Sequence, residues 1–148
     1  MDIYSKLKSM TILLVDDNEV IRGSMQFHFD SHGCRLKTVE TGEEALKAIR
    51  QEKYDIVIVD YRLPGIDGLK FLELVQKSHP KTLKVLITAY GSKKVFAKAA
   101  KLGVHEFIEK PLTVNSLEES LRRLVNNKEY LSTQANNYSG LEQGSRCL

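Results

Sequence analysis

The 148-residue chain has few cysteines, no long apolar run and little net charge, and each of these scarcities excludes a class of protein. Its two cysteines, Cys34 and Cys147, stand far apart, without the clustered spacing of a disulfide scaffold or a metal site. No apolar stretch approaches the about 20 residues that a membrane span needs, and the N-terminus lacks the apolar core of a secretory signal. The sequence therefore favours a reducing, cytoplasmic setting without membrane insertion.

The charge balance of the chain does not indicate a particular class of binding partner. The net charge is +3, from 22 basic and 19 acidic residues, which is weak for a nucleic-acid-binding protein. Hydrophobic residues make up 42% and charged residues 28% of the chain, the balance of an ordinary globular protein. A length of 148 residues suits one domain with a core, so we expect a single globular unit with a tail.

Five short apolar runs recur along the chain, each followed by a stretch with helical spacing. This alternation is typical of βαβ units and a parallel sheet, as in an α/β protein. Three runs are rich in β-branched residues and nearly continuous, like central strands covered on both faces, whereas two are weaker and belong nearer the edges. The central strands are predicted at residues 11–15, 56–59 and 84–88, and the outer strands at residues 35–39 and 106–108.

Five amphipathic stretches follow these runs and predict helices, which makes the pattern (βα)₅. The first helix is predicted at about residues 19–32, and the second starts after Thr41 and runs to about residue 53, with Thr41 and Glu44 at the positions of a capping box. The other three contain residues 69–75, 95–102 and 117–124. The apolar face of the first helix is predicted to comprise Val20, Ile21, Met25, His28 and Phe29.

The composition changes after residue 126, and Asn, Ser, Gln and Gly prevail from there to residue 148. We expect an N-terminal extension at residues 1–9, a globular domain at residues 10–126, and a polar tail or linker at residues 127–148. Leu131 continues the helical stripe of the last predicted helix, so this helix is expected to extend past the domain edge.

Polar side chains follow four of the five predicted strands. Asp16 and Asp17 come after the first strand, Asp60 after the third, Thr88 ends the fourth, and Lys110 follows the fifth. In an open parallel sheet the carboxyl ends of the strands meet at one edge, where ligands bind. We therefore expect these five side chains to converge.

The chemistry of this set points to phosphoryl transfer. Three carboxylates in one cleft repel one another, and protonation or a divalent cation relieves the repulsion. Oxygen ligands without His or Cys favour Mg²⁺ over Zn²⁺. Lys110 and Thr88 supply an ammonium and a hydroxyl for phosphoryl oxygens, and a carboxylate can itself form an acyl phosphate. Taken alone, Asp16 and Asp17 also suit the role of caps on the first helix.

These residues stand in the stretches LLVDDNE, IVIVDYRLPGIDG, VLITAY and FIEKPLT. Together the stretches resemble the receiver domain of bacterial response regulators, similar to the chemotaxis regulators, over about residues 10–126. The resemblance implies a flavodoxin-like fold of three layers with strand order 2-1-3-4-5. It also implies two-component signalling, in which Asp60 accepts a phosphoryl group from the phosphohistidine of a sensor histidine kinase or phosphotransfer protein, with Mg²⁺ as cofactor.

The resemblance further implies a role for each residue of the site. Asp17 and Asp60 would ligate Mg²⁺ together with the backbone carbonyl of Arg62, while Asp16 acts largely through water. Thr88 and Lys110 would contact the phosphoryl oxygens at the catalytic centre. The bond from Lys110 to the proline that follows is expected to be cis.

The same resemblance implies how a signal would leave the site. Thr88 would move toward the phosphoryl group, Phe107 would turn inward, and the face formed by the fourth helix, fifth strand and fifth helix would change shape. Many relatives carry Tyr at the position of Phe107. The fourth helix is basic and suits a partner with acidic patches or a second copy of the domain, through the residues Lys93, Lys94, Lys98 and Lys101.

Arg62 and Tyr90 stand two residues beyond Asp60 and Thr88. In the family these positions border the path of the water that hydrolyses the acyl phosphate. Because both side chains are bulky, we expect them to obstruct this water and to prolong the phosphorylated state.

Other functions fit these residues less well. A phosphatase with an Asp nucleophile would need a D-x-D pair, but Asp16 and Asp17 are followed by Asn18, so this spacing is absent. A flavin protein would need a phosphate loop rich in glycine and hydroxyl residues after the first strand, where this chain has Asp16 and Asp17. No helix-turn-helix segment follows residue 126, so we expect no direct nucleic-acid binding. The four histidines show no metal-ligand spacing.

The expected activity is that of a phosphoacceptor that catalyses only its own phosphoryl transfer and dephosphorylation, not that of an enzyme. The chain is interpreted either as a stand-alone receiver or as a piece of a longer regulator. The alternative is a receiver that works without phosphorylation, as a protein-interaction module.

Overall fold

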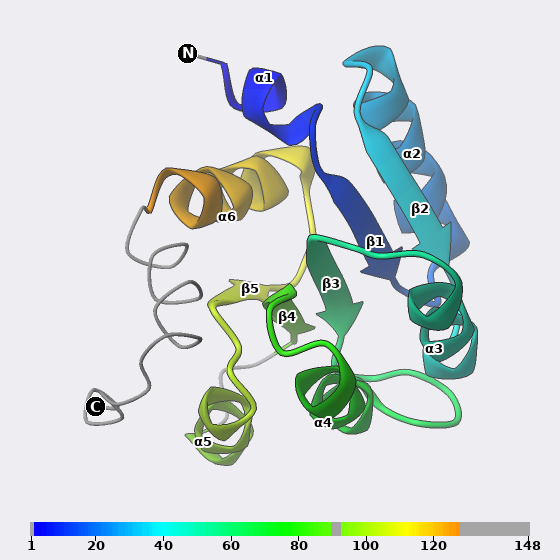
Figure 1. Ribbon diagram of the computed structural model, residues 1–148, viewed down its shortest axis with the longest axis vertical. Helices are drawn as coiled ribbons and strands as arrows, with labels where there is room; N and C mark the ends of the chain where they lie inside the picture. Colours follow the sequence, from blue (N-terminus) through cyan, green and yellow to red (C-terminus); the bar gives the residue numbers. More distant parts are fainter. Residues whose placement is uncertain (1, 90–92, 128–148) are drawn as a thin grey trace.

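The computed structural model describes residues 2–89 and 93–127 of the chain. Five parallel strands form one sheet in the order β2-β1-β3-β4-β5 (Figure 1). The predicted strand order is confirmed, with the two weaker strands at the edges and each end within one residue of its predicted place. The strands are β1 (Thr11–Val15), β2 (Arg35–Val39), β3 (Ile56–Asp60), β4 (Leu83–Thr88) and β5 (Glu106–Glu109).

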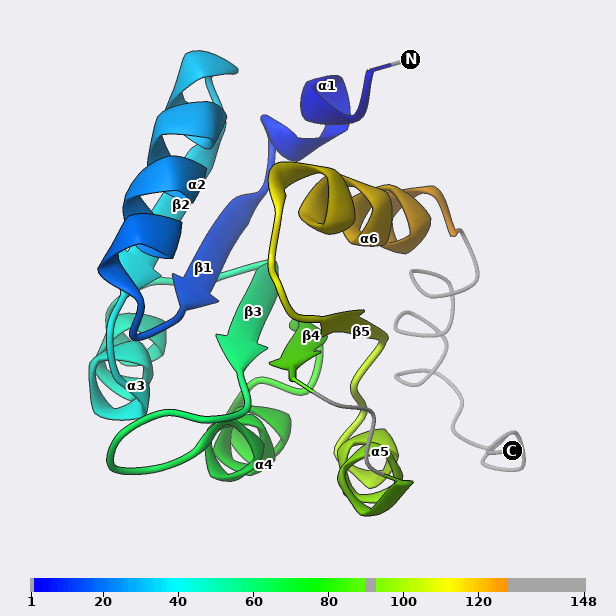
Figure 2. The same cartoon turned by 180° about the vertical axis from the view of Figure 1, so that it is seen from behind.

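Helices cover both faces of this sheet and complete the predicted three-layer, flavodoxin-like architecture (Figures 1 and 2). One face carries α1, α2 and α6, and the other carries α3, α4 and α5. Among the described residues, the helices are α1 (Ile3–Leu7), α2 (Glu19–Ser31), α3 (Gly42–Gln51), α4 (Gly68–Ser78), α5 (Lys93–Lys101) and α6 (Val114–Asn126). None of the helices in these ranges combines the length and apolar character required to cross a membrane.

The core is divided by the sheet into two apolar clusters. Alternate residues of β1 enter opposite clusters: Ile12 and Leu14 pack with α2 and α6, while Leu13 and Val15 pack with α3 and α4. Because side chains of a strand alternate between the two faces, a strand buried on both faces is apolar at nearly every position. This explains why the three inner strands appear in the sequence as continuous apolar runs.

Two features of the helices differ from the prediction. Val20 was assigned to the buried face of α2, but its side chain is 77% exposed, and Met25 and Phe29 make the core contact instead. The short helix α1 was not predicted, because five residues are too few for a periodic pattern to stand out. The predicted extension of the last helix to Leu131 lies outside the described residues.

Capping boxes start two of the helices, and one of the two was predicted. The capping box of Thr41 and Glu44 is present at the start of α3. A second box, Thr113 with Ser116, starts α6 and had not been recognised. The peptide bond between Lys110 and Pro111 is cis, as the resemblance implied.

Candidate functional site

The strand register brings the predicted site residues to the carboxyl edge of the sheet. Val15 pairs with Val59, so Asp16 follows β1 beside Asp60, the last residue of β3. Thr88 ends β4 one position beyond the partner of Asp60, and its carbonyl accepts a hydrogen bond of 2.9 Å from the backbone N–H of Lys110. Parallel pairing therefore brings the carboxyl ends of these strands to one edge of the sheet, although they are far apart in the sequence.

A cleft of about 560 Å³ opens at this edge. The loop after β1 forms one wall and the turn after β5 forms the other. Its lining residues are Asp16, Asp17, Asn18, Ile21, Ala89, Lys110, Pro111 and Leu112.

Three carboxylates meet beside the cleft. Asp16, Asp17 and Asp60 each offer an oxygen, and these oxygens all lie within 4.8 Å of one another. Asp16 and Asp60 are buried, with 3% and 1% of their surface exposed, whereas Asp17 is exposed. Burial raises the pKa of Asp16, and the charges of Asp60 and Asp17 raise it further, while an N–H of Asn18 and the ammonium of Lys110 act in the opposite direction.

The two oxygens of Asp60 have different surroundings. Oδ1 accepts a 3.1 Å hydrogen bond from the backbone N–H of Arg62. Oδ2 lies 2.8 Å from Nζ of Lys110 as an ion pair, but it accepts no hydrogen bond from any described residue although it is buried. A buried carboxylate oxygen without a hydrogen bond is costly, and a ligand or a reaction at the site is one reason for such a group to be retained.

Asn18, and not the two aspartates before it, caps α2. Its side chain accepts from the N–H of Ile21 at 3.0 Å, and its own N–H donates to Oδ1 of Asp16 at 2.9 Å. The interpretation of Asp16 and Asp17 as helix caps is therefore wrong. Because a third residue takes the cap, the carboxylates stay directed to the site.

Arg22 and Gly68 support the site and were missed as such by the sequence analysis. Nη1 of Arg22 donates to the backbone carbonyl of Asp16 at 2.9 Å, which ties the loop after β1 to α2. A Cβ at Gly68 would lie 2.4 Å from the carbonyl oxygen of Asp60, so only glycine lets α4 start this close to β3. The positive φ of +75° explains why Gly65 is a glycine, whereas at Gly68 the reason is the close approach to the Asp60 carbonyl. No sequence signal distinguishes these two glycines.

The predicted switch residues lie on the side of the site toward α5. Thr88 is buried at the end of β4, and Phe107 is half-buried in β5, with its ring edge-on to Phe96 of α5 at a centroid distance of 4.8 Å. Arg62 is exposed, and Tyr90 lies outside the described residues. The predicted basic lysines of α5 are exposed, namely Lys93, Lys94, Lys98 and Lys101.

The donor set suits a hard divalent cation. The three clustered side chains offer only carboxylate oxygens, and the described residues contain no further group of three or more His, Cys, Asp or Glu side chains close enough to share a metal ion. Oxygen donors of this kind fit Mg²⁺ better than Zn²⁺. The cluster is compatible with a magnesium site.

Comparison with known proteins agrees with the fold and identifies the family of the chain. The family model described as "Response regulator receiver domain" matches residues 12–122, and the chain belongs to this family. A receiver domain is a signalling domain, and receivers of response regulators partner with histidine kinases or phosphotransfer proteins.

Individual relatives show the same domain inside longer proteins. The chain is 32% identical to the transcriptional regulatory protein GlrR of Escherichia coli over 77% of this chain and 26% of that protein. It is 26% identical to a cyclic di-GMP phosphodiesterase of Thermotoga maritima over 82% of this chain and 32% of that protein. The chain thus spans about a quarter to a third of the length of these curated relatives.

Solved structures have the same arrangement of strands and helices. The non-phosphorylated HemR receiver domain of Leptospira biflexa matches with a TM-score of 0.73 and 27% identity, over 78% of this chain and 94% of that one. A receiver domain protein of Clostridium thermocellum matches with a TM-score of 0.72 and 26% identity, over 82% and 98% of the two chains.

Proposed function

We propose that the chain is a phosphoacceptor whose Asp60 receives a phosphoryl group from the phosphohistidine of a sensor histidine kinase or phosphotransfer protein. The observation that carries this proposal is the buried Oδ2 of Asp60, which faces the ammonium of Lys110 and accepts no hydrogen bond from the described residues. Family membership supports the identity of the donor. We place this reaction in the cytoplasm, where the reducing setting suits a chain with a free, buried Cys34.

The proposed reaction is a transfer of the phosphoryl group between two nucleophiles. Oδ2 of Asp60 attacks phosphorus, the P–N bond of the phosphohistidine breaks, and the imidazole leaves with the electron pair. Lys110 keeps a positive charge beside the attacking oxygen, and Thr88 offers a hydroxyl to the equatorial phosphoryl oxygens. The N–H of Arg62 holds the other oxygen of Asp60, so the carboxylate is oriented before the donor binds.

Asp16, Asp17 and Asp60 would hold Mg²⁺, together with the backbone carbonyl of Arg62. Their clustered oxygens repel one another, and burial raises the pKa of Asp16, so the pocket favours a bound cation. When bound, the cation would neutralise this charge and that of the incoming phosphoryl group. The residues themselves orient the carboxylate: the N–H of Arg62 holds one oxygen of Asp60, and Lys110 pairs with the other.

The proposed output is a change in the face formed by α5, β5 and α6. Phe107 packs against Phe96, so a turn of the Phe107 ring would disturb the contact between β5 and α5. The exposed lysines of α5 give this face a positive charge that suits an acidic partner or an interface with a second copy. Control of a missing output domain in a longer regulator fits the length of the relatives.

The test is phosphorylation by a small donor. The full chain is incubated with Mg²⁺ and acetyl phosphate, and its intact mass is measured. We expect the wild type to gain one phosphoryl group, Asp60→Asn to gain none, and excess chelator to abolish the gain. Asp30→Asn, which removes an exposed carboxylate on α2, is the matched control and should behave as the wild type.

Two outcomes would contradict this function. An equal gain by the wild type and Asp60→Asn would remove Asp60 from its role. A folded wild type that gains nothing from acetyl phosphate or from a phosphohistidine donor would instead favour a phosphorylation-independent interaction module.

A further inference from the structure

The N-terminal helix α1 precedes the residues that match the receiver family, yet it is packed into the core. The family match begins at residue 12, whereas α1 covers Ile3–Leu7. Ile3 and Tyr4 are each 4% exposed and Leu7 is fully buried, all three in the apolar cluster shared by α2 and α6. This segment is therefore an ordered part of the domain rather than a loose extension.

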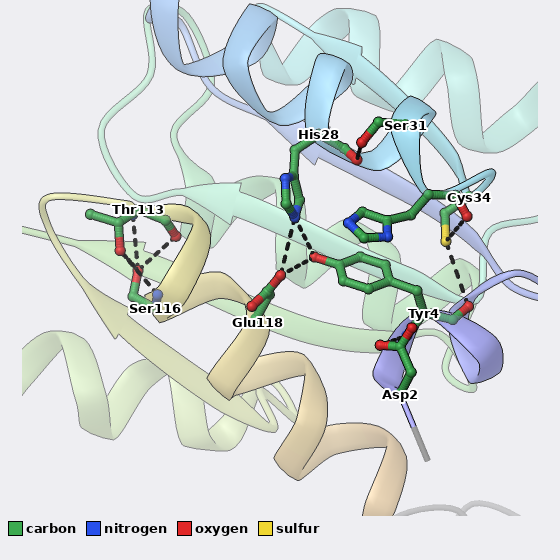
Figure 3. Close-up of polar contacts among 9 residues, drawn as sticks. Asp2, Tyr4, His28, Ser31, Cys34, Thr113, Ser116 and Glu118 are labelled. Carbon is green, nitrogen blue, oxygen red and sulfur yellow. Dashed lines mark hydrogen bonds and ion pairs between the residues drawn. The ribbon is translucent and has the colours of Figure 1, made fainter.

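A ring of polar contacts joins α1 to both neighbouring helices (Figure 3). The hydroxyl of Tyr4 donates to Oε2 of Glu118 on α6. Nε2 of His28 on α2 lies 2.7 Å from the Tyr4 oxygen and 3.1 Å from the same Glu118 oxygen. Because the Tyr4 proton is engaged by Glu118, His28 must donate through Nε2–H. Three helices are thus closed into one hydrogen-bonded triad.

The surroundings of the triad favour an ionised Glu118 and a neutral Tyr4. The hydrogen bond from Tyr4 lowers the pKa of Glu118, and His28 lowers it further. Burial raises the pKa of Tyr4 far above its usual value, and the bond to Glu118 adds to this. A hydrogen bond to a charged acceptor is stronger than one between neutral groups.

Further contacts hold α1 along its length. The Tyr4 ring stacks on His32 at 3.8 Å with an interplanar angle of 7°, and it meets the Phe29 ring edge-on at 5.7 Å. Beneath it, the thiol of Cys34 donates to the Tyr4 carbonyl at 3.7 Å. At the other end, the ammonium of Lys6 binds the side-chain oxygen of Asn126. The helix α1 therefore contacts α6 at both ends, through Glu118 and Asn126.

The opposite side of α6 is joined to the edge strand that leads to the site. Oε1 of Glu106 on β5 accepts from Nε of Arg123 at 3.0 Å and from the hydroxyl of Ser120 at 3.4 Å. The chain passes from β5 directly to Lys110, the ion-pair partner of Asp60. The helix α6 thus lies between the site-bearing strand and α1.

We propose that α1 is a regulatory clasp: when docked it restrains α6 against α2 and β5, and when released it lets α6 move. The docked state is the one in the structure, held by the Tyr4–His28–Glu118 triad and by the burial of Ile3 and Leu7. Because coupling between two equilibria is reciprocal, any ligand or modification that displaces α6 also weakens the docking of α1. The clasp does not require that Asp60 be phosphorylated.

The first test uses hydrogen–deuterium exchange on the full chain. Tyr4→Phe keeps the ring and removes the hydroxyl, so we expect the amides of α6 to exchange about three- to tenfold faster, while those of β1 and β3 stay unchanged. Tyr54→Phe is the matched control, because Tyr54 is also buried and also bonded to a glutamate, but it packs in the other apolar cluster. Its effect on α6 should be absent.

The second test uses the thiol under the clasp as a reporter. Cys34 is 5% exposed, and burial raises the pKa of its thiol, so labelling should be slow while α1 is docked. In a Cys147→Ser background, we expect Tyr4→Phe to accelerate labelling of Cys34 by about the same factor as exchange in α6. In the double variant Tyr4→Phe, Glu118→Gln the effects should be less than additive, because both changes break one contact.

Three results would overturn the clasp. The first is unchanged exchange in α6 in Tyr4→Phe. The second is acceleration that is equal in α6 and in the central strands, which would mean global destabilisation only. The third is faster labelling of Cys34 without faster exchange in α6. None of these readouts depends on phosphorylation, so the clasp can fail or hold independently of the proposed phosphoacceptor function.

Discussion

Asp60 and Lys84 are both charged side chains of inner strands, and each is only 1% exposed. Asp60 ends β3 at the carboxyl edge, where Lys110 and a cleft are near. Lys84 lies near the opposite end of β4, and its ammonium donates to the carbonyls of Thr82 at 2.8 Å and Pro80 at 3.5 Å. Burial of Asp60 thus belongs to the candidate site, whereas burial of Lys84 only opposes folding.

Burial lowers the pKa of Lys84 from 10.5 to about 8. The unfolded chain holds this proton up to about pH 10.5, whereas the native state releases it near pH 8. Stability therefore rises as the pH increases between these values, and the destabilisation is fully present below pH 8. A shift of this size corresponds to on the order of 3 kcal/mol at neutral pH.

We predict that Lys84→Met stabilises the protein. The expected gain at pH 7 is about 1–2 kcal/mol in the free energy of unfolding, less than the full shift because the Thr82 carbonyl loses its donor. The advantage over the wild type should shrink as the pH rises from 8 toward 10.5. Urea denaturation at several pH values measures this. Lys53→Met, at an exposed lysine, is the control, and a loss of stability in Lys84→Met would contradict the prediction.

At the scale of single elements, the ends of helices decide how the site is shaped. Asn18 caps α2 and thereby leaves the carboxylate of Asp16 to face the site. The helix α4 begins at Gly68, whose N–H donates to the carbonyl of Tyr61 at 2.9 Å, directly behind Asp60. Both starts contact residues at or next to the acidic cluster, so small changes there reach the site.

We predict that Gly68→Ala destabilises the protein by about 1–3 kcal/mol, because the added Cβ would lie 2.4 Å from the backbone oxygen of Asp60 and backbone cannot give way cheaply. It should also slow phosphorylation by acetyl phosphate. Gly23→Ala is the matched control: no heavy atom lies within 4 Å of its Cβ, so it should stabilise α2 by about 0.5–1 kcal/mol. Thermal unfolding of both variants tests this, and equal effects would disprove it.

At the scale of the whole molecule, the sheet connects the acidic cluster to two distant regions. Toward α5, the rings of Phe107 and Phe96 pack edge-on. Toward α1, Glu106 and Arg123 join β5 to α6 with a distance of 2.9 Å between Nη2 and Oε1. A displacement of β5 would therefore be felt on both sides of the molecule.

We predict that Mg²⁺ with acetyl phosphate changes hydrogen exchange in β5 and α5 by about twofold or more, while β2 and α3, at the far edge of the sheet, stay unchanged. Phe107→Leu, which loses the ring contact with Phe96, should reduce the change in α5 without preventing phosphorylation. The measurement compares peptides with and without the donor. A change of the same size in Asp60→Asn would show that it does not arise from phosphorylation.

Much of this architecture was predictable because it depends on local patterns. The inner strands were predicted since burial on both faces favours apolar residues at nearly every position, and the meeting of the three carboxylates with Lys110 was predicted since parallel strands place their carboxyl ends together. Val20 was misplaced because helical spacing does not show which flank of an apolar stripe meets the sheet. The helix α1 was not predicted because five residues are too few for a helical period to stand out.

The sequence alone determined the (βα)₅ order, the inner and outer strands and the identity of the acidic cluster, because strand burial, helix periodicity and residue chemistry are properties of nearby positions. Only the tertiary structure decided that Gly68 must be glycine and that Tyr4 meets His28 and Glu118. These contacts join residues that the chain keeps apart, or depend on distances between backbones, and no pattern along the sequence encodes them.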